Sequence, residues 1–358
     1  MNIKLILMHL LTATLLFFTG CGGTGDTEGT GDDTNKIIAR AETQNYNVRP
    51  NEEVFLTSSN SSIGEGTVTY AWLDTDGILL GTESTLTWNA PLLDGDYTII
   101  LVLNHNEPSQ STSSITISVK ENLSPFASIQ NLIQQSHDGT MQDVTYICIG
   151  DSTRVNTLTP DNLTNTSRHI FEDINASLQN YNVTSYLVAQ GGLMFKTFNG
   201  DLHYTVAQQG RSWINVQDAI DKIPNDGATS IVDVSLGSND YSALFHLGYT
   251  SEQIHLEIKS QMMRMITTIK SAKPQTKFLL TSTNPFQDWK IASDTYLNVY
   301  KEVAEENNLP LANFVDDIMP VRGSNDFKSW YLDGIHFNEA VGQPAVSSFV
   351  LEKILPTP

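Results

Sequence analysis

Four short segments of the chain carry polar side chains that could act together on a bound substrate. Three follow strand-like apolar runs and the fourth lies near the C-terminus: Gly150-Asp151-Ser152, Gln190-Gly191-Gly192, Gly237-Ser238-Asn239-Asp240 and Asp333-Gly334-Ile335-His336. In open parallel sheets, the loops after the carboxyl ends of the strands form the ligand crevice. We therefore expect these segments to meet at one edge of such a sheet.

Ser152, Asp333 and His336 have the residue types of a catalytic triad. A serine hydroxyl is a weak nucleophile unless a base accepts its proton, and that base needs a partner that orients it. Asp333 and His336 are three residues apart and can face each other across one tight turn. Asp333 would hold one imidazole nitrogen and leave the other to accept the proton of Ser152. We predict that these three residues are catalytic.

The four segments, in this chain order, resemble the blocks of the SGNH, or GDSL-like, hydrolases, a family of esterases and lipases. The resemblance covers residues 141–355 approximately and includes Thr281-Ser282-Thr283-Asn284-Pro285. It departs from the family name at Thr153, where leucine is expected. The resemblance implies a flavodoxin-like three-layer α/β/α domain with a parallel sheet. It also implies hydrolysis of a carboxylic ester, with short acyl or acetyl groups as candidates, through an acyl-serine intermediate.

The same resemblance implies an oxyanion hole, which needs fixed hydrogen-bond donors. The donors would be the backbone N–H of Ser152, the backbone N–H of Gly192 or Gly191, and the side-chain amide of Asn239. The sequence leaves open which glycine donates. Asp151 and Asp240 are assigned to local turn support and capping.

Other functions remain open at this point. Each segment alone could be an ordinary turn, and a single His336 would be an ordinary surface histidine, but their combination favours catalysis. The same residues would also serve a lysophospholipase, a lipase or an O-acyltransferase, and a rival class is a surface binding protein with an inactive hydrolase fold. The other histidines, His203 and His246 among them, have no comparable partner in the sequence.

The sequence favours chemistry without a cofactor. It contains no His-x-x-x-His pair, no closely spaced cysteines and no Asp-rich calcium loop, so we expect no metal site. Asp and Glu number 40 against 20 Lys and Arg, and no basic patch indicates nucleic-acid binding.

The elements that must position these side chains are predicted by the pattern that begins at Met141. Strand-like runs such as Ile231–Leu236 and Lys277–Thr281 alternate with helical stretches such as Ser251–Lys270, and this alternation predicts a parallel sheet covered by helices over 141–358. Apolar residues in the long helix recur at spacings of three and four, which indicates a face buried in the core. Cys148, in an apolar run, is expected to be buried in a strand.

A separate β-sandwich is expected over residues 37–120. Short alternating runs rich in Thr, Ser, Val and Ile are separated by turn residues. Tyr70-Ala71-Trp72 and Gly95-Asp96-Tyr97-Thr98 resemble segments of PKD and related immunoglobulin-like modules. Residues 121–140 are expected to link the two domains.

The N-terminus resembles a bacterial lipoprotein signal peptide over residues 1–20. Lys4 precedes the apolar stretch Leu5–Phe18, which is shorter than the roughly 20 residues that a spanning helix needs. Cys21 follows Thr-Gly as in a lipobox, and residues 21–36 form a Gly/Thr/Asp-rich tether. We expect an exported protein held through lipidated Cys21 at a membrane, in the periplasm or at the cell surface. Glycan or cell-envelope esters are then the favoured substrates.

Overall fold

The computed structural model describes most of the chain after the first 35 residues. The described residues are 36–43, 45–63, 67–104, 107–155, 169–205, 209, 212–288 and 294–356. The predicted signal peptide, Cys21 and all but the last residue of the predicted tether lie outside them. Within the described residues, no helix is long and apolar enough to cross a membrane.

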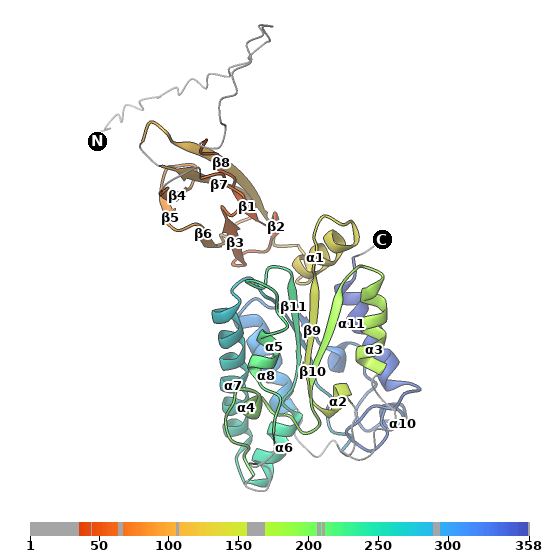
Figure 1. Ribbon diagram of the computed structural model, residues 1–358. Helices are drawn as coiled ribbons and strands as arrows, with labels where there is room; N and C mark the ends of the chain where they lie inside the picture. The colour runs from red at the N-terminus through yellow and green to blue at the C-terminus, as the bar shows by residue number, and fades with distance from the viewer. Residues whose placement is uncertain are drawn as a thin grey trace, which may run out of the picture.

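A five-stranded parallel sheet forms the centre of the C-terminal part (Figure 1). Its strands in spatial order are β10 (Thr184–Ala189), β9 (Thr145–Gly150), β11 (Ser230–Ser235), β12 (Lys277–Thr281) and β13 (Leu311–Ala312). All four neighbouring pairs are parallel. Every residue of β9 and β11 is buried, as expected for strands covered on both faces. The predicted α/β class with a parallel sheet is confirmed.

Helices cover the two faces of this sheet and make a three-layer arrangement (Figure 1). One group that packs together contains α1 (Ala127–His137), α3 (His169–Gln179), α9 (Phe314–Asp317) and α11 (Gly342–Ile354). The other contains α4 (Phe195–Phe198), α5 (Val216–Ile220), α6 (Ser238–His246), α7 (Ser251–Ala272) and α8 (Asp294–Glu306). Two further short helices are α2 (Ser152–Val155) and α10 (Asn325–Ser329).

The long helix α7 forms where the sequence predicted it. Its N-terminus is a capping box, in which Thr250 Oγ1 accepts from Gln253 N–H at 3.3 Å and Gln253 Oε1 accepts from Thr250 N–H at 2.9 Å. The predicted apolar stripe is buried: Ile254, Ile258, Met262, Met265 and Ile269. Cys148 in β9 is buried as well, and burial raises the pKa of its thiol to about 12. Both predictions are confirmed.

The segment 121–140 differs from the predicted linker, because residues 127–137 form helix α1. Ile129, Leu132 and Ile133 are buried in the same core as the parallel sheet. Gln130 Nε2 also donates to the carbonyl oxygen of Lys353, at the end of α11, at 2.9 Å. Burial of this apolar stripe makes the segment part of the α/β domain.

Residues 42–119 form two sheets that enclose a second core. The first contains β1 (Glu42–Thr43), β3 (Glu53–Thr57) and β6 (Thr85–Asn89). The second contains β2 (Asn47–Val48), β8 (Ser111–Val119), β7 (Gly95–Leu103), β4 (Tyr70–Leu73) and β5 (Leu79–Gly81). Trp72 is fully buried between them, and its Nε1–H donates to Glu83 O at 2.9 Å. The arrangement is a β-sandwich, and its kinship with PKD modules stays a prediction.

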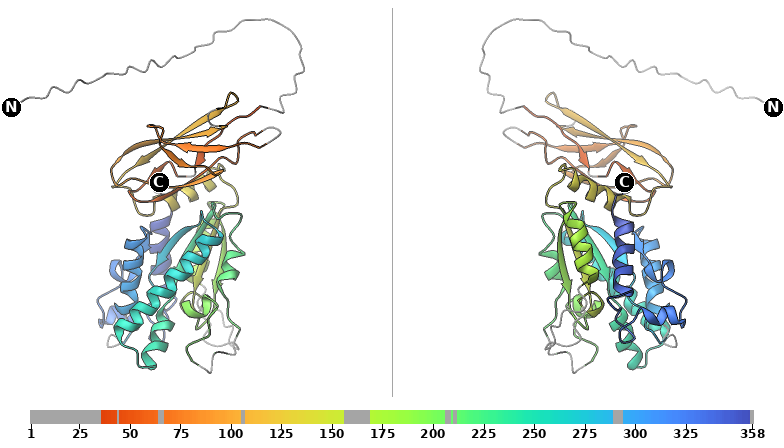
Figure 2. Two further views of the ribbon diagram at one scale, coloured as in Figure 1. Left: turned by 90° about the vertical axis from the view of Figure 1, so that its left-hand side faces the viewer. Right: turned by 90° about the vertical axis from the view of Figure 1, so that its right-hand side faces the viewer.

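The sandwich lies against the end of the parallel sheet at which the strands begin, with α1 between them (Figures 1 and 2). Lys270 Nζ pairs with Glu53 at 2.7 Å, and Asn308 Nδ2 donates to Pro50 O at 3.2 Å. Helix α2, which follows β9, lies at the opposite end of the sheet. The predicted catalytic residues are therefore remote from the sandwich.

Candidate active site

The structure brings Ser152, His336 and Asp333 into one hydrogen-bonded chain. His336 Nε2 lies 2.9 Å from Ser152 Oγ, although the two residues are 184 positions apart. His336 Nδ1 lies 2.7 Å from Asp333 Oδ2. The imidazole can thus give its Nδ1–H to Asp333 and accept the serine proton at Nε2. This is the geometry that a general base and its orienting partner require.

The turn from Asp333 to His336 holds the Asp333 carboxylate next to the His336 imidazole. Asp333 Oδ1 accepts the backbone N–H of Ile335 at 3.1 Å and that of His336 at 2.9 Å. Gly334 has φ +95°, which side-chain-bearing residues rarely adopt, so glycine suits this position. Burial alone would raise the pKa of Asp333, but the hydrogen bonds from His336 and Ile335 outweigh it and hold the pKa below its usual value.

Ser152 is presented by the turn between β9 and α2. The carboxylate of Asp151 is buried, and its Oδ1 accepts the Thr153 N–H at 2.8 Å. Its Oδ2 accepts from Ser238 Oγ at 2.9 Å, which ties this turn to the start of α6. Burial raises the pKa of Asp151, and these hydrogen bonds partly offset the rise. Asp151 therefore supports the turn, in the role that its sequence position predicted.

Asp240 caps a helix other than its own. It is fully buried, and its Oδ2 accepts the backbone N–H of Phe195 at 3.0 Å, at the start of α4. Burial raises the pKa of Asp240 to about 7, and bonds from Phe195 and Lys196 oppose that rise. Asp240 does act as a cap, but the prediction of a local role is wrong, because the helix that it caps begins 45 positions away in the sequence. The identity of the capped helix depends on long-range packing that the local sequence does not contain.

Gly192 and Gly191 differ in position and conformation. Gly192 has φ +79° and borders a cavity together with Asn239, whereas Gly191 does not border it. Among the described residues, no hydrogen bond engages the Gly192 N–H. The positive φ and the cavity distinguish Gly192 from Gly191, but the assignment of the oxyanion donor stays a prediction.

The amide of Asn239 is already hydrogen-bonded. Its Nδ2 donates to Asp151 Oδ2 at 3.0 Å and to the carbonyl oxygen of Leu193 at 3.1 Å. Both N–H bonds of the amide therefore have acceptors. To bind an oxyanion, Asn239 must share or release the bond to Leu193 while the bond to Asp151 holds the side chain in place.

A cavity of about 520 Å³ adjoins Gly192 and Asn239. His203 and Trp213 stack beside it, with ring centroids 5.4 Å apart and planes 16° apart. The other lining residues are Met194, Thr205, Ser242, Ala243, His246 and Leu247. Sequence reasoning gave His203, Trp213 and His246 no role, because only the folded chain places them next to Gly192 and Asn239.

A buried charge pair lies beneath the nucleophile turn. Arg154 is 2% exposed, and its Nη2 lies 3.8 Å from Oδ2 of the fully buried Asp233. Asp233 also accepts from the hydroxyls of Tyr146 and Thr281, each at 2.5 Å. A Cβ on Gly150 would lie 2.3 Å from Arg154 Cγ, so this glycine makes room for the arginine stem. No pattern in the sequence indicates this network, because its members are far apart along the chain.

Among the described residues, no group of three or more His, Cys, Asp or Glu side chains is arranged to hold a metal ion. The expectation that the protein needs no cofactor stays a prediction.

Several solved structures resemble this chain at low sequence identity. No family model matches the chain, and no curated protein sequence matches it. Similar solved structures include the acetylxylan esterase Axe2 from Geobacillus stearothermophilus, at 15% identity and TM-score 0.42 over 60% of this chain and 94% of that one. A lipolytic G-D-S-L family protein from Veillonella parvula has 18% identity and TM-score 0.38 over 58% and 97%. A Bacillus subtilis protein has 16% identity and TM-score 0.41 over 80% and 74%.

Proposed function

We propose that the protein is an SGNH-type serine esterase that hydrolyses carboxylic esters through an acyl-Ser152 intermediate. One observation carries the proposal: His336 contacts Ser152 Oγ at 2.9 Å with one ring nitrogen and Asp333 at 2.7 Å with the other. The turns that carry Ser152 and His336 are 184 positions apart in the sequence. Unrelated turns would not be expected to join a serine, a histidine and an aspartate in this hydrogen-bonded order. The Ser, Gly, Asn and His segments occur in the chain order of that family.

The geometry supports a two-step reaction. Ser152 Oγ bonds to the ester carbonyl carbon while its proton passes to His336 Nε2, and the carbonyl oxygen becomes an oxyanion. The N–H groups of Ser152 and Gly192 and the amide of Asn239 are the proposed donors to that oxyanion. The intermediate then expels the alcohol, which takes the proton from His336. Water repeats the sequence on the acyl-enzyme and releases the acid.

The proposed substrates are acetyl or other short acyl esters on a glycan or on the cell envelope. The cavity next to Gly192 and Asn239 supports a sizeable substrate, because about 520 Å³ is more than an acetyl group occupies. The stacked His203 and Trp213 offer a flat face with polar edges, which suits a sugar ring. The predicted export and anchoring of the chain agree with such a substrate.

The direct test measures hydrolysis of p-nitrophenyl acetate by the full chain and by Ser152→Ala. Ser152→Ala should lose all but background activity and should no longer react with a fluorophosphonate probe. The matched control is Ser114→Ala, which removes an exposed hydroxyl on β8 of the sandwich, remote from the triad, and it should retain kcat. Full activity in folded Ser152→Ala would refute the proposal. Adding glycan acceptors and measuring acetate release against acyl transfer separates hydrolysis from transfer.

A further inference from the structure

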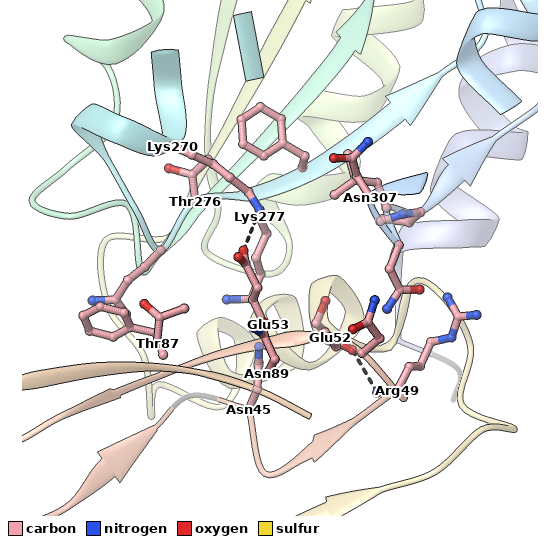
Figure 3. A pocket seen from close by; sticks show the side chains of 18 of the residues that line it. Asn45, Arg49, Glu52, Glu53, Thr87, Asn89, Lys270, Thr276, Lys277 and Asn307 are labelled. Atoms are coloured by element: carbon pink, nitrogen blue, oxygen red, sulfur yellow. Dashed lines mark hydrogen bonds and ion pairs between the residues drawn. The ribbon is translucent and has the colours of Figure 1, made fainter. Parts of the chain in front are cut away.

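A second cavity, of about 320 Å³, lies between the sandwich and the α/β domain (Figure 3). Arg49, Glu52 and Thr87 line it from the sandwich, and Lys270 and Lys277 line it from the α/β domain. The two walls are joined by the ion pair between Lys270 and Glu53 at 2.7 Å. The cavity is therefore bounded by both domains and exists only while they are docked.

This cavity is distinct from the predicted active site. Lys277 begins β12 and is level with Ile231 of β11, which in turn pairs with Tyr146 of β9. Ser152 lies beyond the other end of β9, past Gly150. Four strand residues at ~3.3 Å each place about 13 Å between the two levels. One sugar or acyl unit cannot reach both sites.

The charges that line the cavity cancel. Three cationic side chains, Arg49, Lys270 and Lys277, face three anionic ones, Glu52, Glu53 and Glu306. Six amide side chains add donors and acceptors in equal measure: Asn45, Asn51, Asn89, Gln275, Asn307 and Asn308. The whole chain has a net charge of −20, so the balance of charges is a property of this cavity and not of the chain as a whole. An ionic ligand would find no net opposite charge here, and an apolar one would leave polar groups unpaired.

Glu52 and Lys277 reach the cavity from opposite domains. Burial raises the pKa of Glu52, against the Arg49 N–H bond and the charge of Lys277, which lower it. Burial lowers the pKa of Lys277 to about 8, although the charges of Glu52 and Asp226 oppose this. Both side chains are half-buried in the wall of the cavity. A ligand that offers hydroxyl groups can hydrogen-bond to both.

We propose that this interdomain cavity binds a neutral sugar unit of a glycan. Sugar hydroxyls carry no charge, and they both donate and accept hydrogen bonds. They can therefore bond to the charged side chains and to the amides that line the cavity. Clefts at domain interfaces are common places for ligand sites. Because the cavity is remote from Ser152, the bound unit anchors the glycan and is not the unit that reacts. The site does not depend on the proposed esterase activity.

Two threonines on β6 provide a matched pair of variants. Thr85 and Thr87 are both exposed on the same face of the strand, but only Thr87 borders the cavity. Tryptophan is well tolerated on strand surfaces, so Thr87→Trp should fill the cavity while Thr85→Trp should leave it open. Both changes are made in the full chain carrying Ser152→Ala, which prevents turnover. The probes are xylohexaose, cellohexaose and mannohexaose, titrated by calorimetry.

At least one hexaose should bind the parent and Thr85→Trp with equal affinity, and Thr87→Trp should weaken that binding at least about tenfold. Melting curves check that each variant is folded. If Thr87→Trp does not fold, Asn89→Ala should still weaken binding relative to Thr85→Ala, because it removes an amide from the wall. The proposal is overturned if no hexaose binds up to about 10 mM. It is also overturned if the cavity variants bind as well as their Thr85 controls.

Discussion

The amide of Asn239 connects the nucleophile turn to the proposed oxyanion hole. It donates to Asp151 Oδ2 and to Leu193 O, so its orientation is set before a substrate arrives. Preorganised donors of this kind act mainly when charge develops on the carbonyl oxygen. The contribution of Asn239 should therefore appear in kcat and hardly in KM.

Substitution of Asn239 tests this role. Asn239→Ala should lower kcat by about 10² to 10³ with little change in KM, because one oxyanion donor is lost. Asn239→Asp should be at least as harmful, since it places a carboxylate beside Asp151 and beside the oxyanion. Steady-state kinetics on the best ester, with melting curves to confirm folding, measure both. A near-normal kcat in folded Asn239→Ala would mean that residues 237–240 form only a structural turn.

The pH dependence of activity should have one acid limb. His336 accepts the proton of Ser152 only when its Nε2 is unprotonated, so kcat/KM should fall as the imidazole takes up a proton. Asp333 should remain ionised through that fall, because its hydrogen bonds hold its pKa below the usual value. The measurement is a pH profile of kcat/KM with and without EDTA. Complete loss with EDTA that added metal restores would show that the reaction class is wrong.

At the level of elements, β9, α2 and β11 are joined by the buried pair of Arg154 and Asp233. Burial alone would lower the pKa of Arg154, but the charge of Asp233, together with smaller contributions from Cys148 and Tyr146, raises it overall. Neither Nη1 nor Nη2 makes a hydrogen bond to the described part of the chain, so attraction to Asp233 is the main compensation for burying the guanidinium. Helix α2, and Ser152 with it, depends on this contact.

Removing one partner should cost more stability than removing both charges. Arg154→Met leaves the carboxylate of Asp233 buried without its counter-charge and should lower the free energy of unfolding by about 3–5 kcal/mol. Adding Asp233→Asn removes the remaining charge and should restore part of that loss. Urea denaturation of the wild type, the single variant and the double variant gives the comparison. A double variant less stable than Arg154→Met would show that the pair does not act as a unit.

At the level of the whole molecule, we propose that the sandwich and the esterase domain are held at a membrane by lipidated Cys21. The residue lies outside the described part of the chain, and the proposal rests on the lipobox-like sequence around it. Cys21→Ser should abolish labelling by a fatty-acid probe and move the protein from the membrane fraction to the soluble one or leave it unprocessed. Unchanged labelling of Cys21→Ser would rule out this anchor, and a Cys148→Ser control should still be labelled.

The sequence by itself was sufficient for features that depend on near neighbours. The Asp333–His336 contact closes within one turn, the capping box of Thr250 and Gln253 lies within one helical turn, and the stripe of α7 follows from helical periodicity. Helix α1 also carries an apolar stripe. Its segment was predicted as a linker because of the Pro and Gln/Ser residues in and around it. These interactions are local, so residue type and spacing nearly determine them.

Only the tertiary structure decided which distant groups meet. It gave Gly192 a positive φ, placed His203 and Trp213 beside Asn239 at one cavity, and brought Asp240 to the start of α4. It also buried Arg154 against Asp233, a contact that no sequence pattern indicates. The parallel sheet is the physical reason, because it brings the ends of strands far apart in sequence to one edge. Motif order predicted that Ser152 and His336 meet there, but outside the four segments no local pattern encodes which side chains become neighbours.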